Sequence, residues 1–161
     1  MPPYLLVRHL LRFRTVEECL AELERLPVAS SRALTLCTAN RTVTVELTPT
    51  ARRVIEGGRL LHSNHFLHPD LLAEDRMNIF SRNGSMRRLR RLERLLDEAG
   101  PAPAPEACFT ILSDHAGICV HGEGDVRREE TVGAVVMRPL AGEMHVRRGN
   151  PCRSHSQRFA F

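Results

Sequence analysis

The chain has 161 residues, a length typical of one globular domain. Hydrophobic residues make up 42% of it and charged residues 26%, and no apolar run reaches the ~20 residues that a membrane-spanning helix needs. The formal net charge is +4, all 23 basic residues are arginine, and aromatic residues amount to only 4%. We therefore expect neither a membrane partner nor a nucleic-acid partner bound by base stacking.

Five cysteines are present, an odd number with no Cys-x-x-Cys pair. This pattern favours reduced, mostly buried thiols over a disulfide framework. The segment 1–14 carries arginines among its leucines and has no small-residue cleavage site, unlike a secretory signal. We therefore expect a cytoplasmic protein.

The first thirty residues predict two helices. Leucines at three- and four-residue spacing predict one apolar helix face: Leu5, Leu6, Leu10 and Leu11. Thr15 and Glu18 have the spacing of a capping box, which predicts the start of a second helix that ends before Pro27.

A change of period then predicts an antiparallel sheet. Four short runs follow one another: residues 33–37, 42–47, 52–56 and 59–62. In the second run Val43, Val45 and Leu47 alternate with polar residues, which indicates a sheet with one buried face.

The rest of the chain predicts three helices and a hairpin. They lie at residues 68–77, from Ser85 to about Leu96, at 106–112, and at strands 131–138 and 143–148. The expected class is α+β, with helices packed on a mainly antiparallel sheet. We expect a single, partial domain over residues 1–153 and a flexible polar tail at 154–161.

Two clusters carry side chains capable of chemistry. The first lies where the strand pattern ends: His62-Ser63-Asn64-His65-Phe66-Leu67-His68. Its histidines recur at every third residue, which aligns them only on a helix, so convergent metal ligands are not expected here. Hydrogen bonds to the backbone of a crowded corner are the simpler interpretation.

The second cluster holds four potential ligands within eight residues: Asp114, His115, Cys119 and His121. Their spacing matches no common zinc site, so we expect no metal and no other cofactor, with zinc on the last three kept as a weaker alternative. Cys119 is interpreted as a buried small hydrophobe. Asp114 is interpreted as the carboxylate that orients His115 or His121.

Cys37 is the most conspicuous candidate nucleophile. A catalytic cysteine needs a nearby base, and the twenty residues after Cys37 contain no Asp or His, so core packing is the favoured interpretation. Gly-x-Ser-x-Gly, Gly-x-Gly-x-x-Gly and Walker-type motifs are absent. The arginine-rich segment 87–94 suits phosphates or the anionic part of coenzyme A, although a solvated helix face is the simpler interpretation.

Four motifs in this order resemble the acyl-coenzyme A:6-aminopenicillanic acid acyltransferase family, autoprocessed cysteine peptidases and acyltransferases of the N-terminal-nucleophile class. They are His62-Ser63-Asn64-His65-Phe66, Ser113-Asp114-His115, Ile118-Cys119-Val120-His121 and Gly149-Asn150-Pro151-Cys152. The segment Thr44–Pro49 and the two N-terminal helix patterns are similar as well. The resemblance runs from about Val7 to Cys152.

The resemblance implies part of a four-layer αββα sandwich of two antiparallel sheets, and a hydrolase that cleaves its own precursor. The new N-terminal cysteine would attack amide or thioester carbonyls with its α-amino group as base. Asn64 falls on the family's oxyanion asparagine. Arg127 or Arg128 falls near a positive residue of the site, and we assign Arg128; the binding residues assigned are His65, Asp114 and His115.

In the family, the nucleophilic cysteine precedes the segment that this chain resembles. We therefore expect a C-terminal part that is inactive alone, a partner that is an N-terminal half or another chain supplying the cysteine, and an acyl amide or acyl-CoA substrate. The alternative is a non-catalytic module that binds a small ligand or a protein on the same scaffold. Two apolar faces are expected to lack cover, one with Val43, Val45 and Leu47, the other with Val132, Val135 and Met137.

Overall fold

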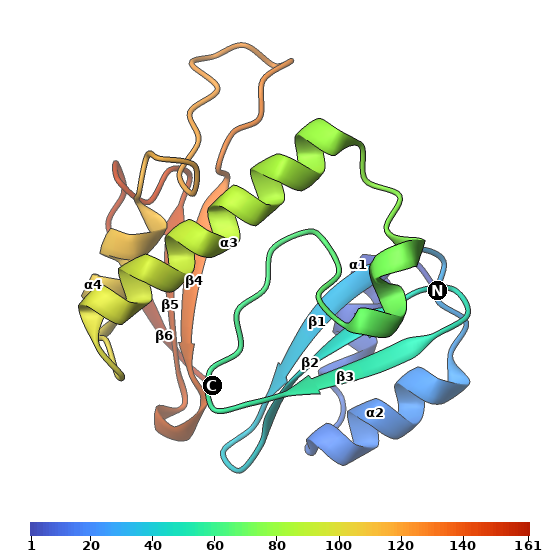
Figure 1. The fold of residues 1–161 in the computed structure, drawn as a ribbon. Coiled ribbons are helices and arrows are strands. Elements are labelled where there is room, and N and C mark those ends of the chain that lie inside the picture. The colour runs from blue at the N-terminus through green and yellow to red at the C-terminus, as the bar shows by residue number, and fades with distance from the viewer. The chain divides into compact units, whose positions relative to one another are not determined.

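The computed structural model describes residues 1–161, and their contacts divide the chain into two compact units, Met1–Asn78 and Ile79–Phe161. Each unit has its own helices and its own three-stranded antiparallel sheet (Figure 1). The sheets are open, and the expected α+β class is confirmed. The single domain over residues 1–153 stays a prediction.

The first unit contains two α-helices, three strands and a 3-10 helix. In chain order these are α1 (Pro3–Leu10), α2 (Val16–Arg25), β1 (Arg32–Cys37), β2 (Thr42–Leu47), β3 (Arg52–Glu56) and η1 (Pro69–Glu74). The second unit contains α3 (Ile79–Ala99), α4 (Pro105–Leu112), β4 (Gly133–Arg138), η2 (Pro139–Ala141), β5 (Glu143–Arg148) and β6 (Gln157–Ala160).

Helix α1 buries a narrower face than its leucine pattern predicts. Leu6 and Leu10, one turn apart, are buried, whereas Leu5 is 58% and Leu11 80% exposed. Leu6 and Leu10 lie on the same side of the helix because they are four residues apart, and the exposed Leu5 and Leu11 lie outside this buried stripe.

The predicted capping box at the start of α2 is confirmed. The Thr15 hydroxyl accepts a hydrogen bond from the Glu18 backbone N–H at 3.1 Å, and the Glu18 carboxylate accepts one from the Thr15 N–H at 3.0 Å. At the other end, the Arg52 guanidinium on β3 donates to the carbonyls of Leu23 and Leu26 at 3.0 and 2.8 Å. The helix is thus fixed to the sheet at its C-terminus.

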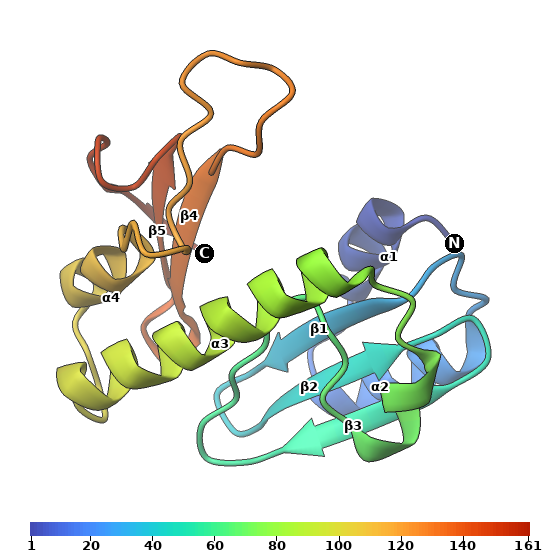
Figure 2. The ribbon, with the colours of Figure 1, turned by 45° about the horizontal axis from the view of Figure 1, so that its top comes forward.

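Strand β2 lies in the middle of the first sheet and is buried on both faces. Its apolar face packs against α1 and α2, so Val43, Val45 and Leu47 are at most 1% exposed. This face is therefore covered, contrary to expectation. On the opposite face Thr44 and Glu46 are also buried, because the segment after β3 crosses the sheet there (Figure 2). The prediction of one buried face is wrong for this strand.

In the second unit α4 packs on β4 and β5. Phe109 of α4 is fully buried, and the guanidinium carbon of Arg147 on β5 lies 4.4 Å from the centre of its ring. The strands run in the order β4-β5-β6, with Val136 opposite His145 in the first pair.

The C-terminal segment expected to be a flexible tail contains β6. Met144 of β5 lies opposite Phe159, and the Phe161 N–H donates to the Gly142 carbonyl at 3.0 Å. Residues 157–160 are all exposed, so they are held by backbone pairing with β5 rather than by side-chain burial. A polar sequence does not reveal such pairing.

Three other boundaries differ from the prediction. Helix α3 begins at Ile79 rather than Ser85 and includes Asn83 and Gly84, two residues of weak helix propensity. The helix expected from residue 68 is the 3-10 helix η1, and residues 59–62 form no strand. None of the helices combines the length and apolar character needed to cross a membrane.

The packing of α1 makes a direct stability prediction. Leu6→Ala is expected to lower the free energy of unfolding by about 3 kcal/mol, because it removes a fully buried side chain and leaves a cavity. Leu5→Ala, on the adjacent exposed position, is expected to change it by less than about 0.5 kcal/mol. Denaturant unfolding followed by circular dichroism measures both, and equal losses would contradict the packing described.

The capping box predicts a pH dependence. The backbone N–H groups of Arg14 and Thr15 donate to the Glu18 carboxylate and lower its pKa. The resulting stabilisation is present above the unfolded pKa of glutamate, about 4.3, and is lost as the pH falls through the lower folded pKa.

Glu18→Gln is therefore expected to flatten the acid-side loss in Tm between neutral pH and about pH 3. Glu24→Gln, an exposed position on the same helix, serves as the control and should follow the parent curve. Superimposable curves for Glu18→Gln and the parent would show that the cap contributes nothing.

Candidate functional site

A fully buried carboxylate holds the segment that carries Asn64. Glu46 on β2 is 0% exposed, and its Oε1 accepts hydrogen bonds from the Leu67 N–H at 2.6 Å and His62 Nε2 at 2.8 Å. Its Oε2 accepts one from the His68 N–H at 2.9 Å. A buried charge is tolerated only when its oxygens are satisfied in this way. Residues 62–68 are thus fixed to the middle strand at both ends.

His62 connects the backbone of this segment to Glu46. Its Nδ1 lies 2.7 Å from the Ser63 carbonyl oxygen, and its Nε2 lies 2.8 Å from the Glu46 carboxylate. The imidazole is thus held through both ring nitrogens, one beside the segment's own backbone and one beside the buried carboxylate.

Asn64 itself is exposed and lines a cleft of about 390 Å³ in the first unit. The cleft is also lined by Ser63, Phe66 and charged side chains that include Arg32, Asp75 and Arg76. His65, next in the chain, is only 7% exposed, and its Nδ1 lies 3.3 Å from the Ser63 hydroxyl. In this loop Asn64 therefore faces the cleft, whereas His65 is buried in the protein interior.

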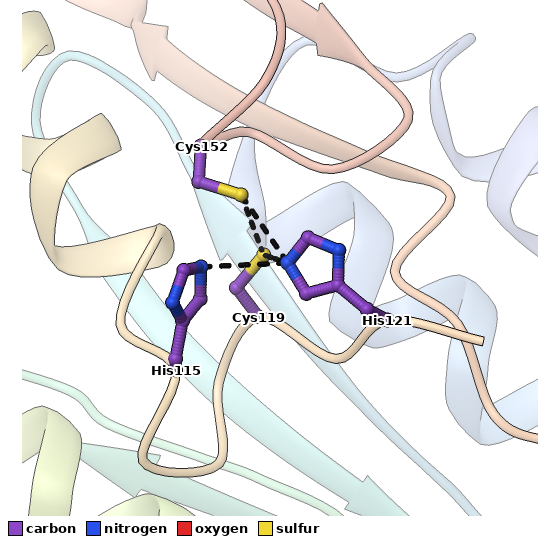
Figure 3. Close-up of side chains that lie close together, drawn as sticks. All are labelled: His115, Cys119, His121 and Cys152. Carbon is purple, nitrogen blue, oxygen red and sulfur yellow. Dashed lines mark hydrogen bonds between the residues drawn. The ribbon is translucent and has the colours of Figure 1, made fainter. Parts of the chain in front are cut away.

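The second unit brings four chemically active side chains together in the loops after α4 and β5. Figure 3 shows His115, Cys119, His121 and Cys152 converging, with one ligand atom of each lying within 4.8 Å of the others. The two sulfurs are 3.7 Å apart, and the two Nε2 atoms are 3.4 Å apart. His121 Nε2 lies 3.7 Å from the Cys119 sulfur and 3.3 Å from the Cys152 sulfur.

Asp114 has a different partner from the expected one. Its carboxylate accepts from Arg91 Nε of α3 at 3.0 Å and from the Ala116 N–H at 3.0 Å, rather than orienting His115 or His121. The Arg91 guanidinium lowers the pKa of Asp114. Asp114 pairs with Arg91 of α3 rather than with a histidine because the guanidinium donates two N–H groups to the carboxylate.

The arginines near residue 127 lie in the loop between His121 and β4. Arg128 faces the carboxylates of Glu123 and Asp125, at 3.3 and 3.9 Å, and Arg127 pairs with Asp125. Arg127 is the more exposed of the two side chains, at 87% against 62%. The assigned residues thus divide between the units, with Asn64 and His65 in the first and Asp114, His115 and Arg128 in the second.

The cysteines are less uniformly buried than the sequence predicts. Cys19 and Cys119 are buried, but Cys37, expected in the core, is exposed at the end of β1. Its sulfur contacts the Thr42 hydroxyl at 3.1 Å and the Thr38 carbonyl at 3.8 Å. Cys152 is exposed as well, and desolvation together with the Cys119 thiol raises its pKa.

The positions of two side chains in these arrangements were not predicted from the sequence. Glu46 occupies the polar side of an alternating strand, where exposure is the usual outcome. Cys152 is thirty-one residues from His121 and joins the cluster only because β5 returns the chain to that loop. The Asn-Pro-Cys motif was the available signal, but nothing local connects it to His115, Cys119 and His121.

Comparison with known proteins gives one positive finding. The family model described as Acyl-coenzyme A:6-aminopenicillanic acid acyl-transferase matches residues 1–153 of the 161. No curated protein matches the chain. The match covers both units and contains Asn64 and all four members of the His/Cys cluster.

The Glu46 anchor makes a stability prediction. Glu46→Gln is expected to lower the free energy of unfolding by about 3 kcal/mol, because the amide has one acceptor oxygen and cannot accept from all three donors, which leaves a buried polar group unsatisfied. Glu56→Gln on β3 is the control, since that exposed carboxylate pairs only with Arg41 at the surface. Denaturant titration compares them, and a similar loss in both would mean that the anchor is energetically unimportant.

Proposed function

The chain belongs to the acyl-coenzyme A:6-aminopenicillanic acid acyltransferase family, and from this premise we propose that it forms the carbonyl-binding part of an acyl-transfer site that acts on acyl amides or thioesters. In this proposal Asn64 is the oxyanion donor, and the attacking thiol comes from an N-terminal cysteine outside the segment described. The chain is then inactive alone. The reaction is that of an N-terminal-nucleophile hydrolase.

The observation that carries the proposal is the presentation of Asn64. Its side chain is exposed at a cleft large enough for an acyl group, while the segment around it is held by the buried Glu46. An oxyanion donor must be fixed before the reaction, because a donor that has to reorganise during the attack stabilises the transition state less. The rigid backbone supplies that fixation, and the amide N–H supplies the hydrogen bond.

Cys19, Cys37 and Cys108 do not have the surroundings of an activated nucleophile. Burial raises the pKa of Cys19 and of Cys108. Cys119 and Cys152 lie beside His121, but partial desolvation and the Cys119 thiol raise the pKa of Cys152. Cys37 is exposed, but a hydroxyl and a carbonyl are its contacts, and neither takes up a thiol proton. A thiolate at neutral pH requires a base or a positive neighbour. An external thiol is therefore the simpler source.

The proposed step is balanced. The N-terminal cysteine sulfur bonds to the carbonyl carbon, and its proton passes to the α-amino group of the same residue. Asn64 stabilises the resulting oxyanion. The C–N or C–S bond then breaks, and the leaving amine or thiol takes the proton back. Water or an acceptor amine releases the acyl group from the sulfur.

A groove in the second unit supports an anionic acyl carrier. It measures about 660 Å³ and is lined by four arginines of α3, Arg87, Arg90, Arg91 and Arg94. Guanidinium groups bind phosphate oxygens through paired N–H donors. The phosphates of acyl-CoA would meet Arg87, Arg90 and Arg94, since Arg91 already pairs with Asp114, and acyl-CoA is accordingly the favoured thioester. Arg128 of the same unit remains the positive residue that the family resemblance implies.

An uncovered sheet face supports a partner segment. Val135 of β4 is 46% exposed, Met137 61%, and Phe159 of β6 46%. Strand register places all three on the same side of the second sheet, together with Met144 and Val146. Exposed apolar patches of this kind mark an interface. We propose that this face receives the segment that carries the nucleophile.

The test of this function is an assay of thioester and amide hydrolysis. The full chain is expected to show no turnover alone, and turnover is expected after mixing with an N-terminal half of the same family that begins with cysteine. In the mixture Asn64→Ala is expected to lower kcat about 100- to 1,000-fold, because it removes one oxyanion donor. Asn40→Ala, at the β1–β2 turn, is the matched control and should retain full activity.

Two results would overturn the proposal. Turnover by the chain alone that disappears in Cys37→Ser would make an internal thiol the nucleophile. Tight acyl-CoA binding without turnover in any mixture would instead favour the non-catalytic binding module.

A further inference from the structure

The His/Cys cluster of the second unit goes beyond the proposed acyl transfer. Two thiols and two imidazoles converge there (Figure 3). The acyl transfer proposed above uses none of Cys119, His121 and Cys152, and the binding role expected of His115 does not explain why it lies beside them. From this geometry we propose that His115, Cys119, His121 and Cys152 bind one Zn²⁺ ion in a closed, tetrahedral structural site.

Four of the six distances between the donor atoms fit a tetrahedral zinc ion, and the two from His115 to the sulfurs lie within 4.8 Å. Zinc lies about 2.3 Å from sulfur and about 2.0–2.1 Å from nitrogen, so a tetrahedral site requires S–S, N–N and S–N edges of about 3.8, 3.3 and 3.5 Å. The corresponding distances in this cluster are 3.7 Å between the sulfurs and 3.4 Å between the nitrogens. The two S–N distances at His121 are 3.7 and 3.3 Å. Four edges thus agree within about 0.2 Å.

Other interpretations of the cluster fit less well. A disulfide requires the sulfurs to lie about 2.05 Å apart, whereas they are separated by 3.7 Å and both cysteines are free. A catalytic cysteine–histidine pair needs one thiol and one base, which leaves a second thiol and a second imidazole unexplained. Two thiolates, two neutral imidazoles and Zn²⁺ together form a neutral centre, which suits a site where Cys119 is only 2% exposed.

The loops that carry the ligands are held by bonds that do not involve a metal. The backbone N–H groups of Ile118 and Cys119 both donate to the Asp114 carbonyl, at 3.1 and 2.8 Å, and close a tight loop. Gly117, with φ of 138°, makes that loop possible, because residues with a Cβ rarely adopt this conformation. The ligands from this loop are therefore close to their binding positions before an ion arrives.

Asn150 joins the two ligand-bearing segments. Its side chain is 8% exposed, and its Nδ2 donates to the Val120 carbonyl at 2.7 Å and lies 3.6 Å from the Cys119 sulfur. An N–H group aimed at a thiolate is a common outer partner that orients metal ligands. Asn150 precedes Cys152 by two residues, so the same side chain positions a ligand from each segment.

The zinc proposed here has a structural role. All four coordination positions are filled by protein side chains, which leaves none for water or substrate. The ion would connect the loop after α4 to the turn after β5. Between these two segments the chain forms only the short elements β4, η2 and β5. Binding to the folded chain alone stabilises it by linkage. Zinc is expected to stabilise the second unit.

The test uses the full chain, reduced and stripped of metal with a chelator, and titrates it with Co²⁺ and then Zn²⁺. We expect one Co²⁺ per chain, with the intense visible bands of a tetrahedral ion and a thiolate-to-cobalt charge-transfer band that Zn²⁺ abolishes. Zinc is also expected to raise the Tm of the stripped protein. Neither readout requires acyl-transfer activity, so failure of this site and failure of the proposed function are distinguishable.

Substitutions identify the ligands. Cys152→Ser and His115→Ala, both at exposed positions, are expected to weaken zinc binding at least about 100-fold, and Asn150→Ala about 10-fold. Cys37→Ser and His155→Ala are the matched controls, since they remove the same side-chain types outside the cluster. Circular dichroism of the metal-free variants confirms folding, and the two ligand variants serve as alternatives should one fail to fold.

Two outcomes would overturn the proposal. One is an absence of the tetrahedral cobalt spectrum in fully reduced, folded protein, with the same Tm in chelator and in zinc. The other is equal zinc affinity in Cys152→Ser and Cys37→Ser. In the first case, a mass lower by two hydrogen atoms before reduction would identify Cys119 and Cys152 as a redox pair instead.

Discussion

The buried carboxylate of Glu46 is the constraint on which the position of Asn64 depends. Removing a carboxylate from water is costly, and the cost is offset only when good hydrogen bonds replace the lost hydration. The three donors all come from residues 62–68, the segment that carries Asn64. The energetics of one side chain on β2 therefore determine where a potential oxyanion donor lies. An unsatisfied Glu46 would disturb the strand and the site together.

The same strand explains why the anchor is rigid. Val43, Val45 and Leu47 fill the space below α1 and α2, and Glu46 occupies the other face. A strand buried on both sides, and hydrogen bonded to β1 and β3 along both edges, has few ways to move. The loop after β3 is held to this strand by the hydrogen bonds that the Glu46 carboxylate accepts from Leu67 and His68. Preorganisation of this kind is what an oxyanion site requires.

Local patterns predicted the elements whose stability is itself local. The Thr15–Glu18 capping box, the strand at 42–47 and the hairpin strand at 143–148 follow from neighbouring residues, and the structure contains all three. Strand β6 and the burial of Glu46 depend on partners far along the chain, so no nearby residue reveals them. Asn64 was identified from its motif. Its exposure beside a cleft required the structure, because the lining residues range from Ser31 to Met77.

The His/Cys cluster shows how tertiary structure alters the interpretation of a motif. Within residues 114–121 the ligand spacing fits no common zinc site, and three ligands leave a coordination position open. The return of the chain through β5 places Cys152 at that position and completes a closed set. A closed set has a chemical consequence for a chain in this family. Thiolates bound to a fully coordinated zinc ion would be shielded from acyl groups, so Cys119 and Cys152 would not compete with the proposed N-terminal nucleophile for the same carbonyl. Burial raises the pKa of the Cys19 thiol, which makes that cysteine a poor competitor as well.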